Sequence, residues 1–286
     1  MNLKKYRPSS SQIQSLIGDG CYQPFIFSDE FISGIGYSWV TGELIIAMDK
    51  ANDIAYRWQA PNMPLKRIKN YITDENWELF VDCNTRLRNM YDSWINHTLN
   101  ALDFPLDYSV VDTASNAGYF LYKFKEKEAG TCIGYDLLDF SNVFSTLNTL
   151  TGYNVKFFNK SYDMTSHTIP DSSPADIVIS CAIMCHLSDP LNYLAFLGSI
   201  TKKALLLFTS VDDTDTFQII YDGAKAFYPD ARFPNCFDAN TRISKGVLLF
   251  GLKELGFSEI IELPYSDLWI PLETYKKFKT IVALKE

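Results

Sequence analysis

Long hydrophobic segments are missing from this sequence of 286 residues. No apolar run approaches the roughly 20 residues that a membrane-spanning helix requires. The first residues, Met1-Asn2-Leu3-Lys4-Lys5, lack the apolar core of a secretory signal peptide. Internal repeats and low-complexity segments are not visible either. We therefore expect a cytoplasmic protein with no membrane partner, built on one substantial core with a smaller appended unit.

Cysteine spacing typical of metal or redox sites is also missing. The six cysteines include no Cys-x-x-Cys pair, so we expect reduced thiols. Cys181, Cys185 and His186 are close in sequence, but a zinc site needs a fourth ligand that the segment does not supply. Asp189 with Asp212-Asp213 could hold magnesium, although a helix cap and a solvated loop explain these carboxylates more simply. We expect no bound metal.

Basic charge is scarce. The chain has 26 Lys and Arg residues against 34 Asp and Glu residues, which gives a net charge of −8. Its basic runs, such as Lys276-Lys277 with Lys279, are short. Proteins that bind nucleic acid neutralise phosphates with a basic face, so this balance argues against a nucleic-acid substrate.

Glycine is sparse at the one place where a dinucleotide site would need it. Apolar residues lead to Asp112, a small-residue turn runs to Gly118, and an amphipathic run begins at Tyr119, which predicts strand, tight turn and helix. A second short strand ends at Asp136, whose carboxylate can accept both hydrogen bonds of a ribose diol. The turn lacks Gly-x-Gly-x-x-Gly, so the pattern indicates an adenosine site without the NAD fingerprint.

The segment from Asp112 to Phe120 resembles the first motif of the class I S-adenosylmethionine (SAM)-dependent methyltransferases. A common form of that motif is Asp-x-Gly-Cys-Asn-Ala-Gly-Tyr/Phe, and Asn116, Ala117 and Gly118 match it. Ala114 stands where the family usually has glycine, near the methionine portion of the cofactor. Glycine allows either close approach to a ligand or a positive φ, and alanine tolerates the first demand better than the second.

A second block strengthens the resemblance. The sequence from Ala175 to Leu191 is similar to the fourth strand and following loop of the family, and Asp163-Met164 follows the apolar strand Val155 to Phe158 where the family often contacts adenine. The resemblance implies SAM as cofactor and S-adenosylhomocysteine (SAH) as product. The residues that it assigns to the cofactor are Asp112, Ala114, Asn116, Gly118, Tyr119, Asp136, Leu137, Asp163, Met164 and Cys181.

The predicted fold class is α/β. Strands are expected near 109–112, 131–136, 155–158, 176–180, 205–209, 259–263 and 280–284, with helices between most of them. The section from Thr209 to about Arg242 is expected to be irregular, and a helix is expected from Ser244 to Leu255. The resemblance implies a Rossmann-like seven-stranded sheet, mostly parallel, with an antiparallel last strand. It covers residues 106–286.

Residues 1–105 are predicted to form a separate, mainly helical N-terminal cap. Leu44 to Trp58 and Glu75 to Leu102 have helical spacing, and the apolar side of the second packs onto the catalytic domain or forms a lid. In the lid interpretation Arg86 or Arg88 reaches the cofactor carboxylate.

His186, after the fourth strand, is the candidate general base, because a near-neutral imidazole can accept a proton from a hydroxyl or ammonium group. Its alternative role is to brace the loop. The resemblance implies methyl transfer to a small-molecule acceptor by an enzyme that could form an oligomer. Two other hypotheses stay open: a tRNA or protein methyltransferase, and a catalytically silent SAM-binding partner subunit, which Ala114 would permit.

Overall fold

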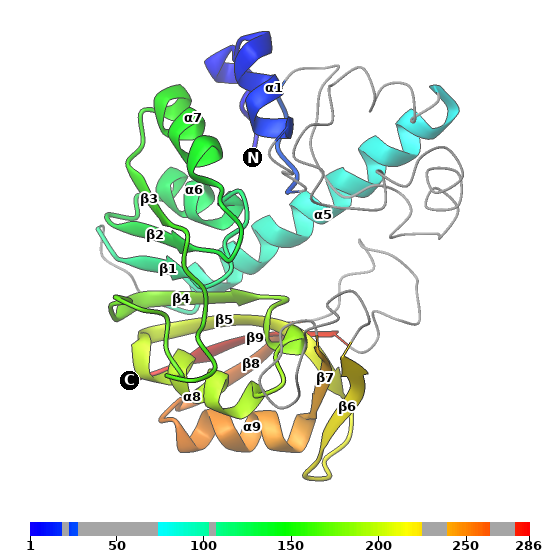
Figure 1. Cartoon of the computed structure of the whole chain (residues 1–286), viewed down its shortest axis with the longest axis vertical. Helices are drawn as coiled ribbons and strands as arrows, with labels where there is room; N and C mark the ends of the chain where they lie inside the picture. Colours follow the sequence, from blue (N-terminus) through cyan, green and yellow to red (C-terminus); the bar gives the residue numbers. More distant parts are fainter. Residues whose placement is uncertain (19–22, 28–73, 103–106, 225–238, 264–277) are drawn as a thin grey trace.

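The computed structural model describes residues 1–18, 23–27, 74–102, 107–224, 239–263 and 278–286 (Figure 1). Its centre is one nine-stranded sheet. The strands are β1 Val110–Asp112, β2 Cys132–Tyr135, β3 Val155–Phe158, β4 Ala175–Cys181, β5 Thr201–Asp212, β6 Ile219–Ala224, β7 Ala239–Ser244, β8 Glu259–Leu263 and β9 Phe278–Leu284.

Seven of these strands have the predicted arrangement. Strands β3, β2, β1, β4 and β5 lie side by side in that order and are parallel. β9 is antiparallel to β5, and β8 is antiparallel to β9. The series β3-β2-β1-β4-β5-β9-β8 therefore contains one reversed strand, the last in the chain. The predicted fold class is confirmed.

The prediction of an irregular section from Thr209 to Arg242 was wrong in part. β5 continues to Asp212, and β6 and β7 form an antiparallel pair. β7 joins the end of β5 in parallel, through the pairs Val211↔Ile243 and Asp212↔Ser244. The β-prone runs within β6 and β7 are short and far apart in sequence, so local periodicity gives little indication that they pair.

Helices cover both faces of the sheet (Figure 1). One face carries α5, α6 and α7, and the other carries α8 and α9, as their separate hydrophobic clusters show. The helices are η1 Lys4–Tyr6, α1 Ser10–Gly18, α5 Asp74–Asn100, α6 Tyr119–Glu126, α7 Ser141–Thr151, η2 Met184–His186, α8 Pro190–Ile200 and α9 Lys245–Glu254. Among the described residues, no helix is both long enough and apolar enough to cross a bilayer.

Local signals in the sequence explain where α8 and α9 begin and end. The Asp189 side chain accepts a hydrogen bond from the Asn192 amide at 3.3 Å, and Pro190 occupies the first turn of α8. The Ser244 hydroxyl accepts from the Val247 amide at the start of α9. Gly256 follows that helix with φ of 84°, a left-handed conformation that glycine adopts without penalty. These contacts match the predicted helix boundaries closely.

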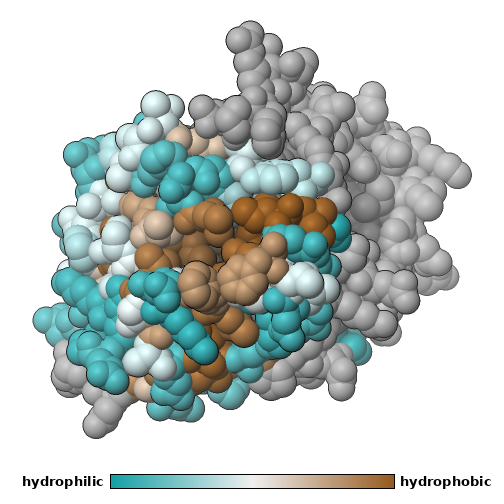
Figure 2. Space-filling view, turned by 90° about the horizontal axis from the view of Figure 1, so that it is seen from below, coloured by the Kyte–Doolittle hydropathy of each residue, from teal (hydrophilic) through white to brown (hydrophobic). Residues whose placement is uncertain are grey.

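Exposed apolar side chains gather on the face formed by α8 and α9 (Figure 2). Phe250 of α9 is 52% exposed, and Phe217, just before β6, is 67% exposed. Their ring centroids lie 5.4 Å apart in an edge-to-face arrangement. The two exposed rings thus contact each other edge to face on the protein surface.

Helix α5 joins the N-terminal part of the chain to the sheet. It is continuous over nearly the whole predicted range, and Leu87, Trp94 and Ile95 are buried in the same core as α6 and β5. The Trp94 ring lies 4.9 Å from the ring of Phe208 in β5. The predicted helix 44–58 and the predicted domain boundary between residues 105 and 106 lie outside the described residues.

Because Trp94 packs between α6 and β5, we expect Trp94→Ala to lower the free energy of unfolding by about 3–5 kcal/mol in urea denaturation. Ser93→Ala, on the adjacent polar side of α5, is the matched control and should change stability by about 0.5 kcal/mol or less. Equal stabilities of the two variants would contradict the docking of α5 on the sheet.

Candidate cofactor site

The candidate site lies where the sheet changes its direction of winding. β1 pairs with β2 on one side and with β4 on the other, and the chain proceeds outward from this centre in both directions. Ligands of open parallel sheets bind at such a switch point, beside the carboxyl ends of the strands. Asp112 ends β1, Cys181 ends β4, and Asp136 follows β2. The fold thus brings these predicted site residues to one edge of the sheet.

The two carboxylates hold the turn after β1. The Ala114 amide donates to Asp112 Oδ1 at 3.2 Å, and the Asn116 amide donates to Asp136 Oδ2 at 2.8 Å. The second contact joins the end of β2 directly to the turn. Asp136 Oδ1 also accepts from the Leu138 amide at 2.9 Å. Asp136 therefore orders two loops in addition to any role with a ligand.

Other amides of the turn are bonded as well. The Ser115 amide donates to the Tyr135 carbonyl at 2.8 Å, and the Gly118 amide donates back to the Ser115 carbonyl at 2.8 Å. The Tyr119 amide, at the start of α6, donates to Gln23 Oε1 at 2.8 Å. Free amides at a helix N-terminus are what bind a phosphate in dinucleotide sites. Here protein acceptors already occupy the amides of Ser115, Gly118 and Tyr119.

Ala114 meets no conformational penalty in this turn. Between residues 113 and 118 the positive φ angles are 45° at Asn116 and 82° at Gly118, and Ala114 is not among the residues with positive φ. Asparagine and glycine are the residue types that adopt this region most readily. Ala114 is also half-buried whereas its neighbours in the turn are buried. Its methyl group replaces the family's glycine without strain.

Asp112 is the most perturbed carboxyl group of the site. It is 1% exposed, and within the described part of the chain its Oδ2 atom has no hydrogen-bond partner. Burial raises the pKa of Asp112 to about 8, the Ala114 amide lowers it and the charge of Asp136 raises it further. The buried Asn116 Oδ1 atom likewise has no partner among the described residues. Two acceptors are thus available to a donor or a cation.

The backbone at Asp136 and Leu137 is held by hydrogen bonds from Asn159, the residue after β3. Burial raises the pKa of Asp136, although the Leu138 and Asn116 amides oppose this shift. Asn159 Nδ2 donates to the carbonyl oxygens of Asp136 at 3.1 Å and Leu137 at 2.9 Å. Leu137 itself is 56% exposed. An exposed apolar side chain thus lies next to Asp136 in the chain, where it could contact a planar ring.

Asp163 and Met164 lie in the connection between β3 and β4. Asp163 is exposed, and its carboxylate accepts from the Thr165 amide at 2.8 Å and the Ser166 hydroxyl at 2.9 Å, which lowers its pKa. Met164 is buried, and its sulfur accepts from the Ser188 hydroxyl at 3.7 Å. Asp163 thus caps its own turn, while Met164 contacts the loop that follows β4.

Tyr119 points toward α5. Its ring is fully buried, and its hydroxyl donates to Asp92 Oδ1 at 2.9 Å. Lys123 Nζ lies 3.2 Å from the other oxygen of Asp92. The hydroxyl of Tyr119 therefore links α6 to α5, and only its backbone belongs to the turn.

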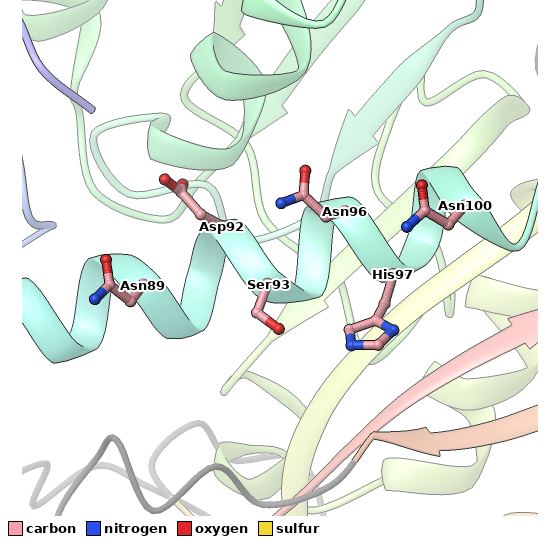
Figure 3. A pocket seen from close by; sticks show the side chains of 6 residues that line it. All are labelled: Asn89, Asp92, Ser93, Asn96, His97 and Asn100. Carbon is pink, nitrogen blue, oxygen red and sulfur yellow. The ribbon is translucent and has the colours of Figure 1, made fainter.

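A hollow of about 360 Å³ lies along α5 (Figure 3). The described residues that line it are polar and belong to α5: Asn89, Asp92, Ser93, Asn96, His97 and Asn100. Asp92, the acidic member of this lining, already binds Tyr119 and Lys123. Among the described residues, the lining of the hollow includes none of the side chains predicted to bind the cofactor.

The loop after β4 carries the remaining predicted residues. Burial raises the pKa of the Cys181 thiol, and the charges of Asp112 and Cys185 act in the same direction. Ala182 has φ of 58°, a strained conformation for alanine, and it leads into η2, which ends at His186. The His186 side chain is exposed, and its amide donates to the Ile183 carbonyl at 2.8 Å. Within the described ranges, no three His, Cys, Asp or Glu side chains are grouped to hold a metal.

A buried hydroxyl network lies beneath the switch point and was not predicted. Tyr193 OH of α8 lies 2.7 Å from Thr113 Oγ1 and 3.0 Å from Ser180 Oγ. Thr113 Oγ1 also donates to the Ile179 carbonyl at 2.9 Å. The network joins β1, β4 and α8. No local pattern predicts it, because its members are 13 and 80 residues apart in the chain.

Solved structures provide a comparison for this geometry. No family model and no curated protein matches the sequence. The structure of an O-methyltransferase family protein from Burkholderia thailandensis is similar, with 13% identity, a TM-score of 0.50, and coverage of 91% of this chain and 79% of that one. The chain has the class I methyltransferase fold. A magnesium protoporphyrin IX methyltransferase from Synechocystis PCC 6803, solved with SAM, has 11% identity and a TM-score of 0.49, and the match covers 85% and 97% of the two chains.

The buried carboxyl of this methyltransferase fold predicts a pH-dependent stability. Asp112 has a pKa of about 8 in the folded chain, well above the value of about 4 of an unfolded chain. The folded chain keeps a proton that the unfolded chain releases, so this residue favours folding below about pH 4 and that contribution is lost as the pH rises toward 8.

We expect the free energy of unfolding of the unmodified chain to fall more between about pH 5 and pH 8.5 than that of Asp112→Asn, measured by urea denaturation. Parallel pH profiles for the two proteins would show that Asp112 is not a buried, unpaired carboxyl group.

Proposed function

We propose that this protein binds SAM and transfers its methyl group to a small-molecule acceptor. The observation that carries the proposal is the pairing of Asp112 and Asp136 at the ends of adjacent strands, beside a turn in which most amides donate to protein acceptors. Such a site offers carboxyl and amide oxygens without partners, and the Asp112 carboxyl can ionise beside a cation. It suits a cofactor with a ribose, a sulfonium and an ammonium group and no phosphate.

The side chains divide between the two ends of this cofactor. Asp136 receives the ribose hydroxyls through its remaining lone pairs, and Leu137 covers the adenine. Asp163 and Met164 lie at the adenine end. Their loop runs from β3 toward the loop after β4. To contact the adenine, the Asp163 carboxylate must break its hydrogen bonds with Thr165 and Ser166.

Asp112 and Asn116 serve the methionine end, where their unpaired oxygens meet a cationic ligand. A positive charge beside Asp112 stabilises its ionised form, so cofactor binding releases a proton near neutral pH. Ala114 and Gly118 shape the turn around that end, and Cys181 borders it from β4. The unstrained Ala114 gives no reason to favour the silent-subunit hypothesis.

Bound SAM supplies an activated methyl group, and the protein must place an acceptor and remove its proton. His186 is the proposed base. It is exposed at the end of η2, on the loop that leaves β4 beside the cofactor edge. The similarity to O-methyltransferase structures and the net charge of −8 favour an acceptor that is a small molecule over nucleic acid.

Asp136→Ala tests the cofactor assignment. We expect SAH binding, measured by calorimetry, to weaken by about 1–3 kcal/mol, the usual cost of losing a charged hydrogen-bond partner. Asp171→Ala removes an exposed carboxylate that pairs with Lys160 and serves as the control, with unchanged affinity. A folded Asp136→Ala protein that binds SAH like the unmodified chain would refute the site.

His186→Gln tests the base. We expect SAH affinity to stay within about twofold of the unmodified protein, while transfer of labelled methyl from SAM to a panel of phenols, alcohols and amines falls by about 10²–10⁴-fold. The residual rate should also lose the pH dependence of an imidazole. Transfer at the original rate would exclude His186 as base, and loss of SAH affinity would instead indicate that His186 braces the loop.

A further inference from the structure

Gln23, which lies far from the sequence motifs, also contributes to the candidate cofactor site. Gln23 is 5% exposed and makes two hydrogen bonds to the turn after β1. Its Oε1 accepts from the Tyr119 amide at 2.8 Å, and its Nε2 donates to the Ser115 carbonyl at 3.2 Å. The amide side chain therefore spans the turn from its third residue, Ser115, to the first residue of α6.

The segment that carries Gln23 is anchored in the core. Phe25 and Phe27 are buried, and the Phe25 ring lies 5.5 Å from the Tyr119 ring. Ile26 exchanges backbone hydrogen bonds with Met1 and Leu3, at 2.9 and 2.7 Å. Gln23 is thus held in place by packing and by a short backbone pairing, and the turn receives a rigid partner.

Helix α6 depends on this partner for its cap. Gly118 precedes the helix with φ of 82° and has no side chain with which to cap it. The first amide of α6 is therefore satisfied by Gln23, a residue 96 positions earlier. In dinucleotide-binding sheets the same helix terminus, after the first strand, binds the pyrophosphate. In this protein the neutral side chain of Gln23 binds the first amide of that helix instead.

We propose that Gln23 positions the cofactor turn and selects against phosphate-bearing nucleotides. The inference rests on the proposed function, because the turn that Gln23 holds is the proposed SAM site. A buried neutral side chain occupies the acceptor position at the first amide of α6, where a phosphate oxygen would otherwise bind. The carboxyl groups across the turn ionise beside a sulfonium compound and attract it, whereas an anion gains no such interaction.

Gln23→Ala and Gln12→Ala form a matched pair for the test. Gln12 is the control because its Oε1 also accepts a backbone hydrogen bond, from Ser9, but at the exposed start of α1. We expect Gln23→Ala to weaken SAH binding at least tenfold in calorimetry and Gln12→Ala to leave it unchanged. Inorganic pyrophosphate, used as the anion probe, should bind Gln23→Ala more tightly than the unmodified chain, an effect that lost packing alone would not produce.

Gln23→Glu keeps the acceptor for Tyr119 but loses the donor to Ser115, so its SAH affinity should be intermediate; it decides the outcome if the alanine variant does not fold. Unchanged SAH affinity in a folded Gln23 variant overturns the positioning role, and no gain of pyrophosphate binding in Gln23→Ala overturns the selectivity. Failure of the unmodified chain to bind SAH would refute the proposed function itself, so the two failures are distinguishable.

Discussion

The need to satisfy buried backbone groups governs this site. The turn between β1 and α6 is almost entirely buried, so its amides must find acceptors inside the protein. Asp112, Asp136 and Gln23 provide acceptors from three separate segments. The N-terminal segment, the first strand and the second strand are consequently held together at one point, and that point is the edge of the sheet where we propose that the cofactor binds.

The same arrangement determines the chemistry of the site. Among the described side chains of the turn, the buried atoms without a hydrogen-bond partner are both oxygens, the Oδ2 atom of Asp112 and the Oδ1 atom of Asn116. Burial places the pKa of Asp112 at about 8, so its charge depends on what lies beside it. A cationic ligand stabilises the ionised form and an anionic ligand does the opposite. The Rossmann-like scaffold is thereby suited to a sulfonium cofactor.

Sequence patterns predicted the parts of the structure that local chemistry determines. The strands β3 and β8 have their expected bounds, Asp189-Pro190 starts α8, and Gly256 follows α9, because strand propensity, caps and glycine conformations act over a few residues. Asp112 and Asp136 lie together because parallel strands end at one edge of the sheet. Contacts between distant segments were not predictable in this way. Gln23, the hydroxyl network of Tyr193 and the β6–β7 pair depend on tertiary packing, for which one sequence contains no local signal.

Calorimetric titration of the unmodified protein with SAM, SAH and NADH tests the central claim most directly. The geometry predicts that SAM and SAH bind and displace each other, and that NADH does not bind. A folded protein that binds neither SAM nor SAH would contradict the proposed cofactor. Binding of NADH at this edge of the sheet would contradict the proposed role of the hydrogen-bonded turn after β1.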